Sequence, residues 1–199
     1  MAAMDRLDQL VLASASPRRL DLLRQIGIVP AQVDPTEIDE TPQKGELPAN
    51  YAKRIAAAKL ASVAPRHPAC FVLAADTVVA CGRRILPKAE DQNSARRCLE
   101  LLSGRRHHVL GAITIAAPDG KRIERLVDTS VIFKRLSEAE IAAYVAEGEG
   151  LGKAGGYAVQ GRAAVFVRAI SGSYSNVVGL SLYDVGAMLT GLGFKTDHG

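Results

Sequence analysis

Two adjacent arginines, Arg18 and Arg19, stand at the start of a predicted helix, where they could bind phosphate. They follow an apolar run at residues 10–13, which predicts a strand, and a short polar turn. In that turn Ser16 fits the N-cap, and Pro17 fits the first helical position, where its missing N–H costs nothing. A helix N-terminus attracts anions, and guanidinium groups match phosphate oxygens. The stretch therefore predicts a phosphate clamp; the alternative is a solvated basic helix start.

A single aspartate, Asp76, interrupts an apolar run. Residues 71–75 read as a strand buried on both faces, and the apolar pattern resumes at 78–80, after Asp76-Thr77. A buried carboxylate is costly unless a partner compensates it, and ligand-facing carboxylates often lie at strand ends in open α/β sheets. We therefore predict that the strand ends at Asp76 and that Asp76 is a metal ligand, a general base for water, or both. A turn between two strand pieces is the alternative.

An acidic loop is predicted at residues 34–42, where four carboxylates and two prolines fall within nine residues. Carboxylates gathered on one loop can hold Mg²⁺ when phosphates supply further oxygen ligands. The alternative is an ordinary acidic surface loop.

Two lysines have defined places between these stretches. Lys59 lies on a helix predicted over residues 48–63, which prolines bracket at both ends. Its ammonium group could point inward to a phosphate, or it could extend to solvent. Lys88 follows Pro87 in a tight turn, which predicts a cation in a fixed place.

A glycine-rich loop is predicted at residues 148–161, and it contains Lys153, Tyr157 and Gln160. It matches neither a dinucleotide-binding fingerprint nor a Walker P-loop. An amide side chain is donor and acceptor together, so Gln160 could read a nucleotide base. The alternative is a surface glutamine on a flexible loop.

The remaining elements alternate between helix and strand patterns. His107 and His108 open one strand, where they would point to opposite faces, and we interpret both as strand-start or surface residues. A capping box at Ser137 and Glu140 predicts a helix start. We also predict strands at 29–33, 109–116, 122–133 and 163–170, helices at 93–102 and 182–192, a polar turn at 171–176, and a frayed tail at 195–199.

Composition limits the classes of function. The 199 residues suit one domain or one domain with two lobes, and 48% of them are hydrophobic, enough for a core. The formal net charge of +4 is not gathered in blocks, and aromatic residues are few, so we expect no nucleic-acid partner. No apolar run approaches membrane-span length. Three cysteines without metal-type spacing favour a reducing, cytoplasmic compartment.

Taken together and in order, the motifs resemble the Maf family of nucleoside triphosphate pyrophosphatases. The resemblance runs from about residue 10 to residue 194. Its carriers are Leu12-Ala13-Ser14-Ala15-Ser16-Pro17-Arg18-Arg19, Ala75-Asp76-Thr77-Val78-Val79, Leu102-Ser103-Gly104-Arg105, Lys153-Ala154-Gly155-Gly156-Tyr157-Ala158-Val159-Gln160-Gly161 and Gly172-Ser173-Tyr174-Ser175-Asn176-Val177-Val178-Gly179-Leu180.

The resemblance implies a single Maf-like domain over residues 1–199. Its expected α/β fold, similar to that of inosine triphosphatases, has an elongated mixed sheet flanked by helices and two lobes around a central cleft. The family hydrolyses nucleoside triphosphates to the monophosphate and pyrophosphate with Mg²⁺ or Mn²⁺, usually as a homodimer. The context of Gln160 resembles the branch that acts on dTTP and UTP, with modified pyrimidine nucleotides as further candidates.

The resemblance also assigns roles. The family's proton acceptor falls on Asp76 and its acidic partner on Glu40, and these two carboxylates would hold the metal. Its two catalytic lysines fall on Lys59 and Lys88. Its substrate-binding positions fall on Ser14, Arg18, Arg19, Thr77 and Gln160, of which Arg18, Thr77 and Gln160 are tied to base selection.

The chain departs from the family pattern around Lys88, where Pro87-Lys88-Ala89 replaces G-K-P, and at Ser181, which replaces a proline. Gly152 replaces the aspartate before Lys153, and Leu110-Gly111 replaces a threonine-glycine pair. These departures bear on fine geometry and base preference. The rival hypothesis is a non-catalytic nucleotide-binding regulator of cell division and septum formation.

Overall fold

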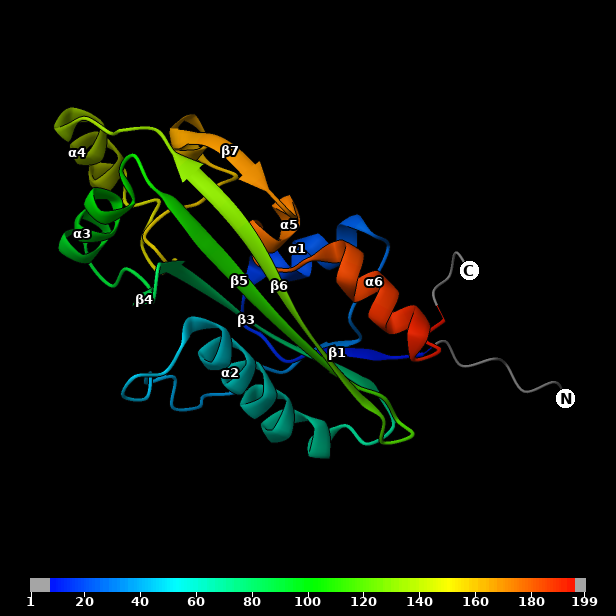
Figure 1. The fold of residues 1–199 in the computed structure, drawn as a ribbon. Helices are drawn as coiled ribbons and strands as arrows, with labels where there is room; N and C mark the ends of the chain where they lie inside the picture. The colour runs from blue at the N-terminus through cyan, green and yellow to red at the C-terminus, as the bar shows by residue number, and fades with distance from the viewer. Residues whose placement is uncertain (1–7, 196–199) are drawn as a thin grey trace, which may run out of the picture.

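A seven-stranded mixed sheet forms the centre of the protein (Figure 1). The computed structural model describes residues 8–195. The strands follow the order β2-β1-β3-β5-β6-β7, with β4 paired to β3. Their bounds are β1 Leu10–Leu12, β2 Gln32–Val33, β3 Phe71–Cys81, β4 Arg84–Leu86, β5 Arg106–Ala116, β6 Arg122–Phe133 and β7 Val167–Ser171. The predicted mixed α/β fold with an elongated sheet is confirmed.

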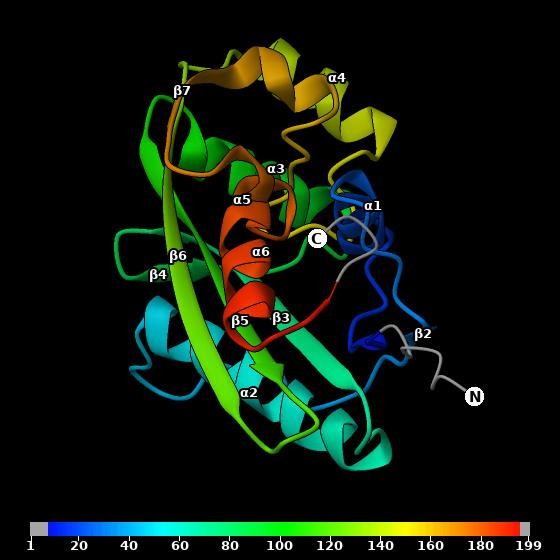
Figure 2. The same cartoon turned by 90° about the vertical axis from the view of Figure 1, so that its right-hand side faces the viewer.

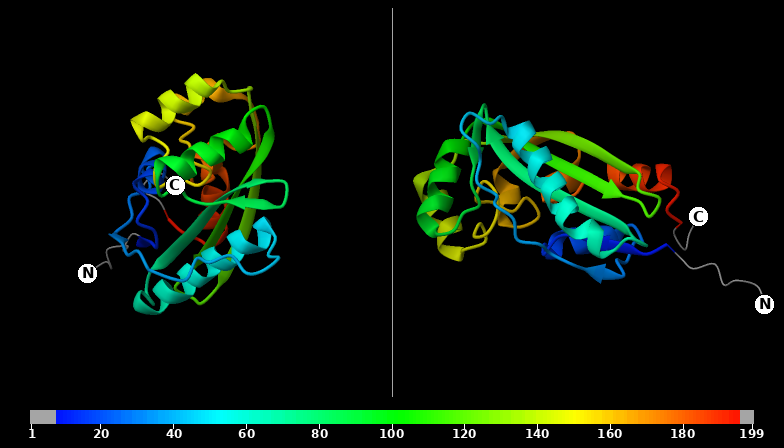
Figure 3. Two further views of the ribbon diagram at one scale, coloured as in Figure 1. Left: turned by 90° about the vertical axis from the view of Figure 1, so that its left-hand side faces the viewer. Right: turned by 90° about the horizontal axis from the view of Figure 1, so that it is seen from below.

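Three long antiparallel strands, β3, β5 and β6, give the body its length (Figure 3). The β5–β6 hairpin turns at Asp119-Gly120, and Gly120 has a φ of 86°, which favours glycine. Strand β1 runs parallel to both of its neighbours, β2 and β3. The carboxyl end of β1 therefore points in the same direction as β3 and leads into the first helix.

Helices cover both faces of the sheet (Figures 1 and 2). Helix α2 packs on one face of β3 and β5 through the buried cluster Ala52, Ala56, Val78, Leu110 and Ala112. The opposite face belongs to the main core, which α5 and α6 join. Because both faces are covered, β3 and β5 read as continuous apolar runs. The helices are α1 Pro17–Gln25, α2 Pro48–Val63, α3 Gln92–Leu102, α4 Glu138–Glu147, α5 Tyr174–Val178 and α6 Leu182–Gly191, with 3₁₀ turns η1 Ala64–Arg66 and η2 Arg162–Phe166.

Several predicted boundaries are correct. Helix α2 spans residues 48–63 as predicted, because prolines at 48 and 65 limit it at both ends. The capping box of Ser137 and Glu140 is present at the start of α4. In residues 8–195 there is no helix that combines the length and apolarity needed to cross a bilayer.

Other predicted elements are wrong in part. Residues 162–166 form η2 rather than strand, so β7 begins only at Val167. The predicted strand at 29–33 is reduced to two residues, and the polar turn at 171–176 gives way to helix α5 from residue 174. The predicted frayed tail lies, from residue 196 on, outside the described residues.

His107 lies at the start of β5, as one of the two predicted interpretations has it, but it is not a surface residue. Its side chain is fully buried, and Nε2 lies 2.8 Å from the Tyr157 hydroxyl. The ring packs edge-on against Phe133 and Tyr157. His108 points to the other face, as predicted, and pairs with Asp128. The burial follows from position, because Phe133 and Tyr157 cover the face of β5 that carries His107.

Candidate functional site

A cavity of about 760 Å³ opens beside the middle of β3. Its walls come from the turn before α1, the acidic loop, α2, β3, the segment around Lys88, the glycine-rich loop and the segment after α5. All the predicted site residues line it: Ser14, Arg18, Arg19, Glu40, Lys59, Asp76, Thr77, Lys88 and Gln160. The structure thus brings together residues from well-separated parts of the chain; their individual roles stay predictions.

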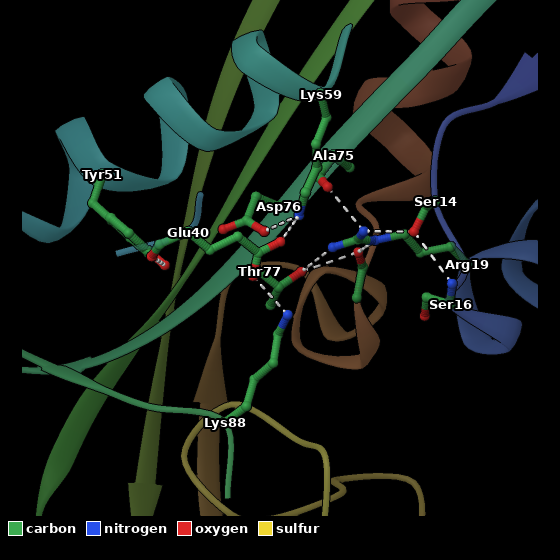
Figure 4. Close-up of polar contacts among 11 residues, drawn as sticks. Ser14, Ser16, Arg19, Glu40, Tyr51, Lys59, Ala75, Asp76, Thr77 and Lys88 are labelled. Atoms are coloured by element: carbon green, nitrogen blue, oxygen red, sulfur yellow. Dashed lines mark hydrogen bonds and ion pairs between the residues drawn. The ribbon is translucent and has the colours of Figure 1, made fainter. Parts of the chain in front are cut away.

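Four charged side chains form a continuous ion-pair chain along one wall (Figure 4). Lys59 Nζ lies 2.9 Å from Asp76 Oδ1 and 2.7 Å from Glu40 Oε1. Lys88 Nζ lies 2.8 Å from Glu40 Oε2. Charges therefore alternate in sign in the order Asp76, Lys59, Glu40 and Lys88, and this set is called the ion-pair chain below.

Asp76 lies inside β3, not at its end, which corrects the predicted strand boundary. The strand continues through Asp76, which pairs with Ala112 of β5. A strand can hold this carboxylate in its interior because Lys59 extends from α2 and compensates the charge. Lys59 is itself buried, so the inward orientation is confirmed and the solvent-directed alternative is wrong.

The charge of Glu40 is stabilised by its lysine partners. Burial alone would raise the pKa of the Glu40 carboxyl, but hydrogen bonds and charges from Lys59 and Lys88 outweigh burial and lower the pKa. Tyr51 supports the acidic loop, because its hydroxyl donates to the Glu40 carbonyl oxygen at 2.8 Å. Burial, then the charges of Asp76 and Glu40, raise the pKa of Tyr51 to about 12, so it remains a donor at neutral pH.

Arg19 is bound on all sides by protein oxygens. Its Nε donates to the Gly179 carbonyl at 3.0 Å and Nη2 to Thr77 Oγ1 at 3.0 Å. Nη1 donates to Ser14 Oγ at 2.9 Å and to the Ala75 carbonyl at 2.8 Å. The guanidinium therefore ties β1, β3 and α5 together at the cavity wall (Figure 4).

Ser14, not Ser16, supplies the hydroxyl that organises the turn before α1. The predicted side-chain cap of Ser16 is absent, although Ser16 does occupy the N-cap position. Ser14 Oγ accepts from the Ser16 amide at 3.3 Å and from Arg19. Buried Ser14 thus satisfies the turn and the arginine at once.

Arg18 differs from Arg19 because it lies half-buried at the cavity wall and one of its nitrogen atoms has no hydrogen-bond partner in the described part of the chain. Its Nε is buried and has no hydrogen-bond partner among residues 8–195. Burial lowers the pKa of Arg18, and burial followed by the nearby charge of Arg18 lowers the pKa of Lys153. Two cations that disfavour one another across a cavity create a place for an anion.

Lys153 and Glu149 also line the cavity, and neither was predicted as a site residue. The sequence signal that could have identified Lys153 is its position in the glycine-rich loop. In the structure, the backbone of this loop is hydrogen-bonded to the segment around Lys88. The Ala89 amide donates to the Lys153 carbonyl at 3.1 Å, and the Gly155 amide to the Pro87 carbonyl at 3.1 Å. These bonds fix Lys88 despite the altered neighbours, Pro87 and Ala89.

Ser181 and Gln160 occupy contrasting places. The Ser181 hydroxyl is buried and donates to Asp184 Oδ2 at 2.6 Å, at the start of α6 and outside the cavity lining. The Gln160 side chain is exposed at the cavity wall. The departure at Ser181 is therefore accommodated by the helix, away from the cavity.

Two carboxylates of the ion-pair chain have the chemistry of a divalent-metal site. Glu40 and Asp76 both reach one ammonium nitrogen, so a cation already stands between them. Within residues 8–195 no cluster of three or more His, Cys, Asp or Glu side chains has metal-binding geometry. A two-carboxylate site suits Mg²⁺ or Mn²⁺ when phosphate oxygens and water complete the shell.

Two named relatives are similar in sequence to this chain over most of its length. A relative from Paramagnetospirillum magneticum, named dTTP/UTP pyrophosphatase, is 69% identical over 185 residues, which cover 93% of this chain and 97% of the relative. A relative from Rhodospirillum rubrum with the same name is 63% identical over 186 residues, covering 94% and 89%.

Two solved structures show more distant likeness. A nucleoside-triphosphatase, also titled dITP/XTP pyrophosphatase, from Mycobacterium abscessus gives a TM-score of 0.41 at 18% identity, covering 64% of this chain and 75% of that one. The Staphylococcus aureus Ham1 protein gives a TM-score of 0.45 at 17% identity, covering 63% of this chain and 72% of that one.

The family model described as Maf-like protein matches residues 9–192. This chain therefore belongs to the Maf-like protein family.

Proposed function

We propose that this protein is a nucleoside triphosphate pyrophosphatase that hydrolyses dTTP and UTP to the monophosphate and pyrophosphate. Family membership and the names of the relatives support the reaction class. The observation that carries the proposal is the ion-pair chain, which lines the same cavity as Arg18 and Gln160. Carboxylates, cationic side chains and the Gln160 amide thus line one cavity large enough for a nucleotide.

We assign the triphosphate to the cationic parts of the wall. Lys59 and Lys88 stand beside the carboxylates, and Arg18 and Lys153 line the cavity as well. Guanidinium and ammonium groups in a partly buried site stabilise phosphate charge more strongly than they would in water. Arg19 would act mainly through Thr77 and the turn, because its N–H groups already bond protein oxygens.

We assign the base to Gln160. Its amide presents one acceptor and two donor hydrogens, which can complement the carbonyl and N–H of thymine or uracil. Its exposed position at the cavity wall supports this assignment. Thr77 lies beside Asp76, and Arg19 and the Gly179 carbonyl hold its hydroxyl in place. We assign Thr77 to contact the sugar and base end of the nucleotide.

In the reaction, Asp76 would orient a water molecule and accept its proton as the oxygen attacks the α-phosphorus. The bond between the α-phosphorus and the bridging oxygen then breaks, and pyrophosphate leaves. Lys59 and Lys88 would stabilise the charge that gathers on the phosphate oxygens. A Mg²⁺ or Mn²⁺ ion held by Glu40 and Asp76 would supply Lewis-acid polarisation when bound.

The proposal includes a cytoplasmic location and a homodimer. The three cysteines, Cys70, Cys81 and Cys98, are free thiols, which suits a reducing compartment. Family resemblance supports the dimer. Sedimentation of the purified protein would give the mass of a dimer; a monomer mass would overturn that part.

The Asp76→Asn variant tests the reaction. It removes the proton acceptor while keeping side-chain volume, so release of pyrophosphate from dTTP with Mn²⁺ should fall about 10²–10⁴-fold. Asp128→Asn is the control, because Asp128 pairs with His108 outside the cavity lining and should keep the wild-type rate.

Turnover by Asp76→Asn at the wild-type rate would contradict the role of Asp76. Tight binding of dTTP by the wild-type protein without pyrophosphate release would instead favour the non-catalytic regulator. Thermal melting of each variant would show whether a lost rate reflects a lost fold.

A further inference from the structure

The side chain proposed to read the base stands on a tight turn, residues 158–161. The Gly161 amide donates to the Ala158 carbonyl at 3.1 Å, which closes the turn, and Gln160 lies near its tip. An exposed glutamine can discriminate a base only if its backbone is held in place, because an unrestrained amide would adapt to many partners. The neighbours of this turn therefore bear on specificity.

Two side chains hold the turn at both ends. The Tyr144 hydroxyl accepts from the Ala158 amide at 3.0 Å and donates to Glu149 Oε1 at 3.1 Å. Glu149 Oε2 accepts from the Arg162 amide at 2.9 Å. A single relay, from Ala158 through Tyr144 and Glu149 to Arg162, thus joins the residue that begins the turn to the residue that follows it.

The relay is built into the core. The Tyr144 side chain is buried on α4, and its ring packs against Phe166 with the centroids 5.4 Å apart. The Glu149 carboxylate lies against the turn: a Cβ placed on Gly161 would come within 2.2 Å of Glu149 Oε1. Glycine at position 161 is therefore what admits the carboxylate, and the carboxylate limits how the turn can move.

We propose that Tyr144 and Glu149 are positioning residues that determine base discrimination by fixing the Gln160 turn. The inference rests on the proposed function in one respect, the assignment of the base to Gln160. Neither residue transfers a proton in this scheme. Tyr144 lies outside the cavity lining, whereas Glu149 lines the cavity and its charge acts on Lys153. Loosening the relay at Tyr144 should therefore weaken recognition of the base and leave recognition of the triphosphate unchanged.

Calorimetry with two probes separates these effects. The first probe is α,β-imido-dTTP, which carries the base and cannot be hydrolysed at the α–β bond; the second is inorganic tripolyphosphate, which has no base. For Tyr144→Phe, the Kd of the imido nucleotide should rise about 3- to 10-fold, the change typical of one lost hydrogen bond. Tyr144→Phe should not change the Kd of tripolyphosphate. Glu149→Gln removes a carboxylate beside Lys153 as well as a bond of the relay, so it should raise the Kd of the imido nucleotide relative to the Kd of tripolyphosphate.

A double-mutant cycle with Gln160→Ala tests whether the effect passes through Gln160. Once the amide is removed, Tyr144→Phe should have no further effect on the imido nucleotide, so the combined loss should equal that of Gln160→Ala alone. Glu147→Gln is the matched control: Glu147 pairs with the Arg162 side chain, not with its amide, and both Kd values should stay at wild type.

Additive losses, an equal rise in the Kd of tripolyphosphate, or no change in either Kd would overturn the inference. Its failure differs from failure of the proposed function. If the wild-type protein binds the imido nucleotide but releases no pyrophosphate from dTTP, the proposed reaction is wrong. The double-mutant cycle then still tests the positioning role of Tyr144 and Glu149. If it binds no nucleotide, both fall.

Discussion

Lys59 holds the two carboxylates of the site, Asp76 and Glu40, close to one another. Its ammonium group lies between Asp76 and Glu40, within 2.9 Å of one and 2.7 Å of the other. A lysine there neutralises two carboxylates that would otherwise repel one another. Glu40 and Asp76 are also the carboxylates proposed to hold a divalent cation, so lysine and metal would compete for the charge of these two groups.

The Lys59→Met variant tests this competition. Without nucleotide, it leaves buried carboxylate charge uncompensated, so its free energy of unfolding should fall by about 3 kcal/mol. Mn²⁺ should bind the variant more tightly than the wild type and restore part of the stability, because a ligand of the folded state stabilises it. Urea unfolding and Mn²⁺ titration monitored by electron paramagnetic resonance would measure both effects.

Lys53→Met is the control, since Lys53 is exposed on the same helix and should alter neither quantity. An unchanged or weaker Mn²⁺ affinity in Lys59→Met would show that lysine and metal do not share these carboxylates.

The two arginines show where sequence reasoning stops at the residue scale. Arg18 and Arg19 have the same chemistry and adjacent positions, so the local pattern predicts one role for both, a phosphate clamp, and only the family resemblance ties Arg18 to base selection. Their environments differ: Arg19 bonds to four protein oxygens, and Arg18 Nε has no partner in the part of the chain that the structure describes. Those partners come from distant segments, such as Thr77 and Gly179, which no local pattern connects to position 19.

At the scale of elements, a buried histidine near the start of strand β5 links this strand to the glycine-rich loop. His107 Nε2 lies 2.8 Å from the Tyr157 hydroxyl, within a cluster that includes Phe133. Burial, and then the neighbouring His108, lower the pKa of His107 from 6.5 to about 4. The imidazole is therefore neutral in the folded protein at neutral pH.

This pKa shift predicts an acid-sensitive fold. Between pH 6.5 and pH 4 the unfolded chain binds a proton at His107 that the folded chain does not, so acidification favours unfolding. A shift of this size corresponds to about 3 kcal/mol of the free energy of unfolding, present above pH 6.5 and lost as the pH falls toward 4. Urea unfolding across this range should show the loss in the wild type and a smaller one in His107→Gln.

His108→Gln, altered on the opposite face of the same strand, should keep most of the loss, because burial is the larger cause of the His107 shift and remains in this variant. Parallel losses in the wild type and in His107→Gln would mean that His107 does not govern the acid response.

Elements were predictable where local signals sufficed. Helix α2 lies between two prolines, and the α4 capping box and the Asp119-Gly120 turn are each set by a few neighbouring residues. The passage of β3 through Asp76 was not predictable, because the compensating Lys59 comes from another element. The short apolar run at 163–170 fits strand or helix, and its first part forms η2.

At the scale of the whole molecule, the cavity exists because the sheet and its connections bring distant segments together. The turn after β1, the middle of β3 and the end of α2 converge because β1 and β3 are parallel neighbours and α2 packs across β3. The acidic loop and the glycine-rich loop then close the remaining sides. Composition and periodicity do not contain that convergence; family resemblance was needed to foresee it.

The position of bond cleavage is a property of the whole assembled cavity. In the proposed reaction, the ion-pair chain places a water molecule at the α-phosphorus, while the cationic wall and the Gln160 turn hold the two ends of the nucleotide. Attack at another phosphorus would require a different placement of the triphosphate relative to Asp76.

Hydrolysis of dTTP in ¹⁸O-labelled water, followed by mass spectrometry of the products, tests this placement most directly. We predict dTMP and pyrophosphate as products, with one ¹⁸O atom in dTMP and none in the pyrophosphate. Label in the pyrophosphate, or formation of dTDP and inorganic phosphate, would contradict attack of water on the α-phosphorus.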